Sequence, residues 1–149
     1  MLFLNFGARV VIVNDLISTK IKFLRDCGAH LCEHSGKTLL EHLEGTRDIL
    51  RKEGAPEYLQ DAGLFHSVYG TTYYMPDEGI STSREDVKKI IGEQAEEIAY
   101  WYCVLQAPRI NEILKFEGQL KEDLLWLDSA NNMEMSTSRM MTWSEAYDI

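Results

Sequence analysis

The chain has 149 residues, the length of one domain with a single hydrophobic core. Its hydrophobic fraction of 45% and charged fraction of 26% are typical of globular proteins, which excludes an intrinsically disordered chain. Asp and Glu outnumber Lys and Arg by 24 to 15, and the resulting net charge of -9 repels nucleic acid and anionic membranes. We therefore expect no nucleic-acid or membrane partner. A small-molecule ligand remains compatible with this charge, because a local basic pocket can override it, and a homodimer stays open.

Cysteine usage and the first residues indicate the cellular compartment to be expected. The three cysteines (Cys27, Cys32 and Cys103) include no CxxC pair, so we expect no disulfide framework and a reducing cytoplasm. Residues 1–14 are apolar, but polar residues interrupt them, which predicts neither a signal peptide nor a membrane span. We divide the chain into an extension (1–14), a helical domain (15–135) and a tail (136–149) that is frayed or forms a short docking helix.

Apolar residues recur at helical spacing along most of the chain, which predicts an all-α bundle of five to seven helices. The helices are expected over residues 15–27, 35–53, 56–69, 83–102, 111–116 and 118–133. Strand-like alternation is weak after residue 14, and residues 71–82 have the composition of a functional loop.

Glycine and serine residues mark where helices begin and end. Gly54 predicts a left-handed cap after the second helix, and Ser83 with its acidic successors predicts an N-cap. Gly92 falls inside the long helix that follows, at a cost of about 1 kcal/mol relative to alanine. The string HSGKT ends like a phosphate-binding loop, but Leu31 stands where that motif needs glycine. A helix start capped by Ser35 is the better interpretation.

Two histidines are the strongest candidates for a functional site. His42 and His66 lie on the apolar sides of neighbouring predicted helices, each about three turns from the joint at residues 54–56. They are therefore expected to lie at similar heights and to meet in the core. His34, about two turns before His42, is a further candidate for the same pocket.

The sequence around these histidines resembles HD-domain hydrolases, especially the bacterial alarmone hydrolases. His42, followed 24 positions later by His66 in DAGLFHSVYGTT, resembles the first histidine and the AALLHD motif of those enzymes. WLDSANNM resembles their LADRLHNM helix, which places Asp128 on the last aspartate ligand and Asn132 on the motif's asparagine. HSGKTLL and GLFHSVYGT also resemble an uncharacterised HD-like family. The resemblance covers about residues 20–135 and implies an HD-like helical bundle.

The chain departs from the HD pattern where the metal charge is neutralised. Ser67 replaces the aspartate that follows the second histidine, so a divalent ion would keep about one uncompensated positive charge in a buried pocket. Gly70 and Thr71 replace the acidic pair that helps alarmone hydrolases activate water. The resemblance therefore implies a pocket with remodelled chemistry and argues against alarmone hydrolysis.

The leading interpretation is a metal-poor or metal-independent enzyme, hydrolase-like or acid/base, or a binder of a small polar metabolite. His42, His66 or Asp128 would act as the base and a histidine or Tyr69 as the acid, while Ser67 and Asn132 orient the ligand.

Two alternatives stay open. One is a metal-dependent HD-type phosphohydrolase with zinc, iron or manganese on His42, His66 and Asp128, and with His34 as a fourth candidate ligand. The other is a non-catalytic scaffold or dimerisation module whose histidines are hydrogen-bonded core residues.

Overall fold

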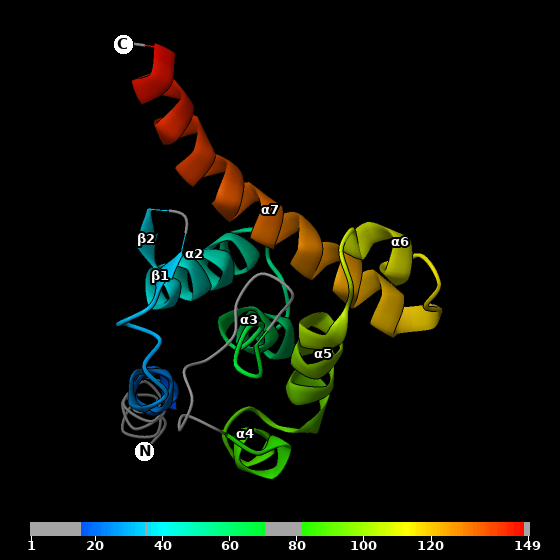
Figure 1. The fold of residues 1–149 in the computed structure, drawn as a ribbon. Coiled ribbons are helices and arrows are strands. Elements are labelled where there is room, and N and C mark those ends of the chain that lie inside the picture. Colours follow the sequence, from blue (N-terminus) through cyan, green and yellow to red (C-terminus); the bar gives the residue numbers. More distant parts are fainter. Residues whose placement is uncertain (1–15, 35, 71–81, 148–149) are drawn as a thin grey trace, which may run out of the picture.

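The structure is a computed structural model that describes residues 16–34, 36–70 and 82–147 (Figure 1). The predicted extension and most of the predicted loop lie outside these residues. Residues 16–26 are helical. The other helices are α2 (Leu39–Lys52), α3 (Glu57–Leu64), α4 (Arg84–Ile91), α5 (Glu93–Val104), α6 (Arg109–Ile113) and α7 (Gly118–Tyr147). This mostly helical structure confirms the all-α class.

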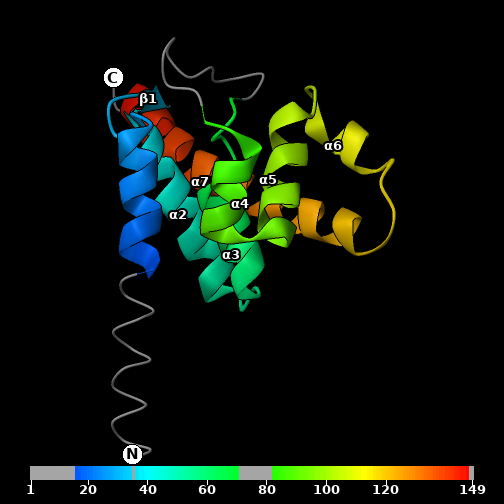
Figure 2. The same cartoon turned by 90° about the horizontal axis from the view of Figure 1, so that it is seen from below.

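The helices pack around α3, which lies near the middle of the bundle (Figure 1). Helix α7 runs past one side of the bundle and contacts α2, α3, α5 and α6. Figure 2 shows the helix of residues 16–26 beside α2, on the opposite side of the bundle from α6. The arrangement brings the helix of residues 16–26, the middle helices and the first part of α7 together in one bundle, while the end of α7 extends away from it (Figure 1).

The HSGKT string forms a short hairpin, so the expected helix start at Ser35 is wrong. Strand β1 (Glu33–His34) pairs antiparallel with β2 (Lys37–Thr38). Gly36 has a φ of +85° in the turn between them, a conformation that favours glycine. Helix α2 then begins at Leu39, and the Thr38 hydroxyl caps it by accepting a 3.1 Å hydrogen bond from the Glu41 amide.

The predicted long helix over 83–102 is divided in two. Ser83 caps α4 as predicted, because its hydroxyl accepts a hydrogen bond from the Asp86 amide. Gly92, however, has φ +85° and ψ +166°, so it ends α4 instead of lying inside a helix. The last helix is longer than predicted, since α7 runs to Tyr147 through most of the predicted tail.

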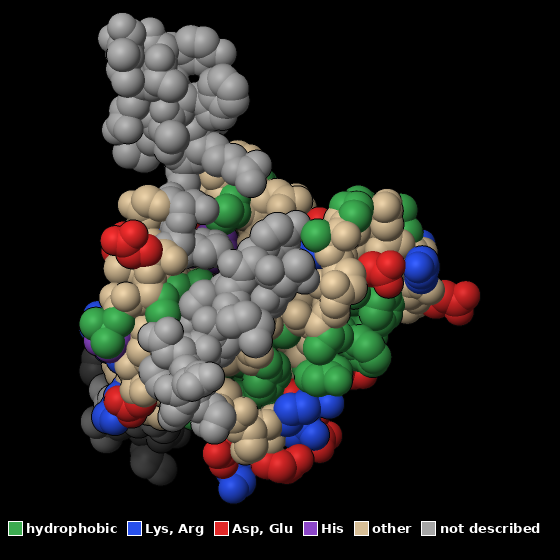
Figure 3. Space-filling model, viewed as in Figure 1, with side chains coloured by type: hydrophobic (Ala, Val, Ile, Leu, Met, Phe, Trp, Pro, Cys, Tyr) green, Lys and Arg blue, Asp and Glu red, His purple; other side chains and the backbone are tan. Residues whose placement is uncertain are grey.

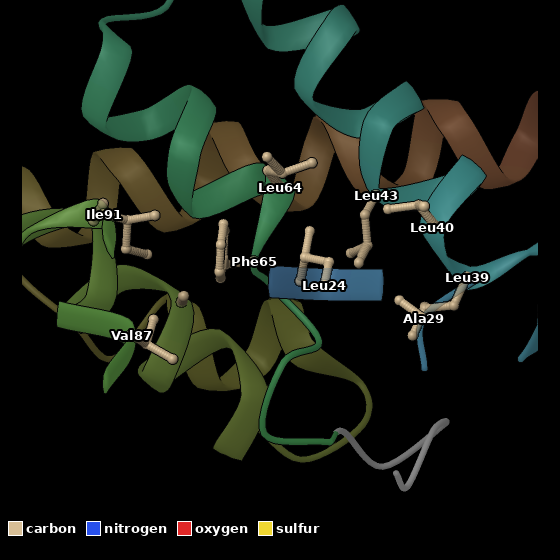
Figure 4. Close-up of a cluster of buried hydrophobic side chains, with 11 residues drawn as sticks. Leu24, Ala29, Leu39, Leu40, Leu43, Leu64, Phe65, Val87 and Ile91 are labelled. Atoms are coloured by element: carbon tan, nitrogen blue, oxygen red, sulfur yellow. The ribbon is translucent and has the colours of Figure 1, made fainter. Parts of the chain in front are cut away.

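Buried apolar side chains form two clusters. The first joins the helix of residues 16–26 to α2, the end of α3, α4 and α5, with Leu24, Leu43 and Phe65 near its centre (Figure 4). The second joins α2, α3, α5 and α6 to α7, and includes Leu50, Leu59, Tyr102, Leu124 and Leu127. Polar side chains of α2 and α7 are buried along with these clusters, and they form the candidate site.

A buried ion pair holds the helix of residues 16–26 to α3. The Lys20 ammonium lies 2.9 Å and 3.0 Å from the two carboxylate oxygens of Asp61, and both side chains are less than a tenth exposed. Burial raises the pKa of Asp61, and the Lys20 hydrogen bond and charge oppose that rise.

The outer surface carries some exposed apolar side chains. On the face in Figure 3 hydrophobic side chains gather over α5 and α6, where Val104, Ile110 and Leu114 are exposed. No helix within the described part of the chain is long and apolar enough to cross a membrane.

Candidate functional site

The candidate site is a set of buried polar side chains from α2, α7 and the turn after α3. His42 lies on α2 and His66 two residues beyond the end of α3, and each is only 1% exposed. Asn131 and Glu134 reach the same place from α7, and they are 6% and 7% exposed. Burying four such groups is costly unless they satisfy one another, so their contacts decide what the site can do.

His42 makes three polar contacts. Its Nδ1 lies 2.9 Å from Oε1 of Glu134, and Nε2 lies 3.0 Å from Oδ1 of Asn131 and 3.3 Å from Nε2 of His66. The other oxygen of Glu134 accepts a 3.0 Å hydrogen bond from the Lys37 ammonium. Because a carboxylate paired with lysine accepts hydrogen bonds, Nδ1 of His42 is the donor.

His66 is fixed by the backbone and by neighbouring rings. Its Nδ1 donates to the Gly63 carbonyl oxygen at 2.7 Å, which directs Nε2 at His42. The His66 ring meets the rings of His42 and Tyr102 edge on, with centroids 5.1 Å and 5.4 Å apart. The Cys103 thiol donates to the His66 carbonyl oxygen, and burial raises the pKa of that thiol to about 12.

Local structure explains why the two histidines meet. Helix α3 ends at Leu64, and residues 65–69 form turns that bring His66 back beneath the last turn of the helix. His42 lies on the buried face of α2, one turn before Thr46, which is also fully buried. The sequence predicted this meeting correctly, although it placed His66 within a longer helix.

Asp128 belongs to a neighbouring group. Its carboxylate accepts a 2.8 Å hydrogen bond from the Tyr102 hydroxyl and a 3.3 Å hydrogen bond from the Asn132 amide. Burial, opposed by the charge of Arg109 and reinforced by Asp128, raises the pKa of Tyr102. Asp128 is thus one ring away from His66, with Tyr102 between them.

The other predicted site residues lie in different surroundings. Ser67 is buried beside His66, and Asn132 is exposed on α7. The backbone of His34 pairs with Lys37 in the hairpin, while its side chain lies outside the described part of the structure.

Tyr69 is part of a separate clamp. Its hydroxyl donates to Glu96 at 2.8 Å, and burial together with this hydrogen bond raises the pKa of Tyr69. Arg84 holds the same carboxylate through two hydrogen bonds of 2.6 Å and 2.9 Å. No described contact joins Tyr69 to the histidine pair.

Asn131 and Glu134 were not predicted as site residues. They continue the stripe of Leu124, Leu127 and Asp128 at three- and four-residue spacing, so polar residues in the register of a buried face were the available signal. The sequence alignment favoured the exposed Asn132 over its buried neighbour.

Of the side chains that converge here, only the two imidazoles are placed as ligands of a divalent metal ion would be. The 3.3 Å between the two Nε2 atoms is close to the separation of two imidazoles on one tetrahedral ion with bonds of about 2.0–2.1 Å. Each Nδ1 is also hydrogen-bonded to an oxygen, Glu134 for His42 and the Gly63 carbonyl for His66, as is common for histidines that bind a metal ion through Nε2. In the described part of the chain the third atom that converges on the pair is a neutral amide oxygen, and the Asp128 carboxylate bonds Tyr102 instead. Among the described residues, no group of three or more His, Cys, Asp or Glu could hold a metal ion.

The model of one protein family matches residues 23–107, more than half of the chain, and its description is domain of unknown function, DUF6817. The chain belongs to the DUF6817 family. His42 and His66 lie inside the DUF6817 match, whereas Asn131 and Glu134 lie beyond it on α7. Comparison with curated proteins gave no match, and neither did comparison with solved structures.

An open surface groove lies away from the histidines of this DUF6817 domain. It runs between the end of α2 and the first half of α7, and its lining includes Glu53, Gln119, Glu122, Asp123, Trp126 and Ser129. Trp126 donates its indole N–H to Glu53 across the groove at 3.0 Å. None of the residues of the histidine pair lines it, so the convergence of polar atoms, and not this groove, defines the candidate site.

Proposed function

We propose that the histidine pair is a metal-independent acid–base site for a small polar metabolite. The observation that carries the proposal is the 3.3 Å approach of two Nε2 atoms whose Nδ1–H groups are both committed elsewhere. If both imidazoles were neutral, the Nε2 lone pair of His42 would point at the Nε2 lone pair of His66, and the two would repel each other. A proton held at the pair removes that repulsion.

The hydrogen-bond partners indicate where this proton resides. The Asn131 oxygen can only accept, so Nε2 of His42 donates to it while Nδ1 donates to Glu134. When the pair holds this proton, His42 donates from both ring nitrogens and its ring faces the Glu134 carboxylate. His66 retains an Nε2 lone pair that faces the donor.

These positions assign complementary roles. His42 is the proton donor and His66 the proton acceptor. Asn131 orients the His42 ring so that its Nε2 faces His66. Histidine suits both roles because its unperturbed pKa of about 6.5 lies near physiological pH. A hydroxyl or phosphate ester group on a small metabolite has the hydrogen-bonding capacity that such a pair recognises.

The proposal includes a distant relationship to HD domains. Its support is that the histidines of α2 and of the segment after α3 meet, with the aspartate-bearing helix α7 against them. Its chemistry differs, because Ser67 replaces an acidic ligand and Asp128 is bonded to Tyr102. This difference is why we favour acid–base chemistry over metal-assisted hydrolysis.

A metal-dependent HD-type phosphohydrolase is the second candidate. The observation in its favour is the Nε2–Nε2 separation, which suits one ion as well as one proton. It requires a ligand set other than His42, His66 and two carboxylates.

Metal analysis and ligand binding separate these candidates. Tag-free protein is analysed by plasma mass spectrometry, and metabolite binding is followed through the histidine ¹⁵N resonances. The native chain is compared with His42→Gln, His66→Gln and the control His30→Ala, whose histidine lies outside the pair. We expect no stoichiometric metal, and metabolite-induced shifts of the pair that only the first two variants abolish.

Other outcomes have defined meanings. Near-stoichiometric metal that disappears in His42→Gln and His66→Gln would support the second candidate. Histidine resonances that respond to no phosphorylated or hydroxylated metabolite, combined with lower stability in both variants, would instead support the scaffold role.

A further inference from the structure

Gly45 lies in the middle of α2, where glycine has no conformational role. Its φ is not positive, unlike that of Gly36, Gly54 or Gly92. Glycine at an interior helix position is less favourable than alanine. The reason for glycine at this position must therefore lie in its surroundings.

The surroundings of Gly45 are filled by Glu134. A Cβ atom at position 45 would lie 2.7 Å from Oε2, 3.0 Å from Cδ and 3.2 Å from Cγ of Glu134. The 2.7 Å contact is shorter than real Cβ contacts, so a side chain at position 45 would require the Glu134 carboxylate to move away from the α2 backbone. Position 45 is three residues after His42 and on the same side of the helix. The missing side chain thus opens the route by which Glu134 reaches His42.

Lys37 completes the placement of this carboxylate. It lies on β2 and binds one oxygen of Glu134, while the other oxygen accepts from His42 Nδ1. Two fixed donors and the Gly45 backbone leave the carboxylate one orientation. In that orientation the Nδ1 proton is held and Nε2 is directed at His66.

We propose that Glu134 is a positioning residue that holds the proton of neutral His42 on Nδ1, and that Gly45 provides the space that its carboxylate occupies. The inference deepens the proposed function, on which its catalytic meaning rests. Neither residue was assigned to the site by the motif resemblance. Both act through His42 and neither needs to touch a ligand.

The test reads the tautomer directly in the full chain without a ligand. Long-range ¹H–¹⁵N spectra of the imidazoles are recorded at a pH where they are uncharged, for the native protein, Gly45→Ala and Glu134→Ala. Native His42 is expected to hold its proton on Nδ1. In both variants we expect a second population protonated on Nε2, because the carboxylate is displaced or absent.

Two control variants make the result specific. Gly92→Ala also places alanine at a glycine position, but its Cβ would meet nothing within 4 Å, so it strains the chain without touching Glu134 or the histidines. Glu134→Gln keeps an acceptor oxygen of the same size. Both are expected to retain the native tautomer.

An unchanged His42 tautomer in Gly45→Ala or in Glu134→Ala overturns the inference, as does an equal change in Gly92→Ala. If Gly45→Ala does not fold, Glu134→Ala and Glu134→Gln still decide the role of Glu134. Because no metal, ligand or turnover enters the measurement, a failure of the proposed acid–base function leaves this result interpretable by itself.

Discussion

Glu96 is fully buried, yet its carboxylate accepts three hydrogen bonds from two side chains. Burial by itself would raise the pKa of Glu96, but the hydrogen bonds from Arg84 and Tyr69 outweigh it and lower the pKa. The Arg84 guanidinium also stacks on the Tyr100 ring, 3.6 Å from its centroid. The clamp therefore ties the start of α4 and the turn that follows His66 to α5.

This clamp predicts a pH-dependent stability. Because the folded-state pKa of Glu96 is below its unfolded value, the stabilisation is complete above that unfolded value, about 4.3, and is lost as pH falls through the folded pKa. Glu96→Gln should be less stable near neutral pH and lose less stability on acidification. Urea unfolding at a series of pH values measures this, with the exposed neighbour Glu97→Gln as control. Parallel pH profiles for Glu96→Gln and the native protein would contradict the role of the clamp.

At the scale of elements, Gly92 separates two helices that the apolar pattern joins into one. Its φ of +85° and ψ of +166° are accessible essentially only to glycine, and a Cβ atom there would meet nothing within 4 Å. Conformation, and not packing, therefore requires glycine at this position. The change of direction sets the angle at which α5 continues toward the site.

Gly92→Ala is expected to lower the free energy of unfolding by about 1–3 kcal/mol, because alanine must adopt a strained conformation or bend the chain. Denaturant unfolding measures the change. Gln94→Ala, an exposed substitution inside α5, is the control and should change stability little. A Gly92→Ala variant as stable as the native protein would show that α4 and α5 can join without cost.

The sequence predicted those elements whose ends carry an unambiguous local signal. Ser83 followed by acidic residues specified the start of α4, and Gly54, with φ +82°, specified the end of α2. Gly92 and Gly36 were misjudged because glycine in a helical pattern and glycine in a turn look alike without the backbone angles. The hairpin was missed because strands of two residues show no alternation.

Only the part of the candidate site formed by neighbouring helices, His42 and His66, was predictable from the sequence. The helical spacing from residues 54–56 placed His42 and His66 at one height, and they do meet. Glu134 is 92 positions from His42, and its contact depends on how α7 crosses α2 and on the space at Gly45. A single sequence does not encode such a crossing in any local pattern.

For the whole molecule, α7 is the element on which both the core and the site depend. Leu124 and Leu127 are fully buried in the second hydrophobic cluster, and Asn131 and Glu134 complete the histidine site. Burial of two leucines contributes about 3–6 kcal/mol, a large share of a typical stability of about 5–15 kcal/mol. The family model matches residues 23–107 and so does not include α7, although α7 supplies part of the hydrophobic core on which those residues pack.

Truncation tests this dependence. A chain that ends after Glu117 lacks α7 and should lose its cooperative thermal transition in circular dichroism. A chain that ends after Ser136 keeps Leu124, Leu127 and Glu134 and should retain a transition close to that of the full chain. A cooperative transition in the shorter chain would show that residues before α7 form an independent core.

The Lys20–Asp61 pair links two positions 41 residues apart so that neither can change freely. Removing one partner leaves a buried charge alone, which typically costs about 3–5 kcal/mol, whereas replacing both by apolar residues is often neutral. Lys20 lies outside the segment that matches the family model and Asp61 inside it. A chain that loses one partner before the other is therefore less stable than either end point, so we expect the residues at positions 20 and 61 to be exchanged together. The helix of residues 16–26 should accordingly be retained wherever a charge at position 61 is retained.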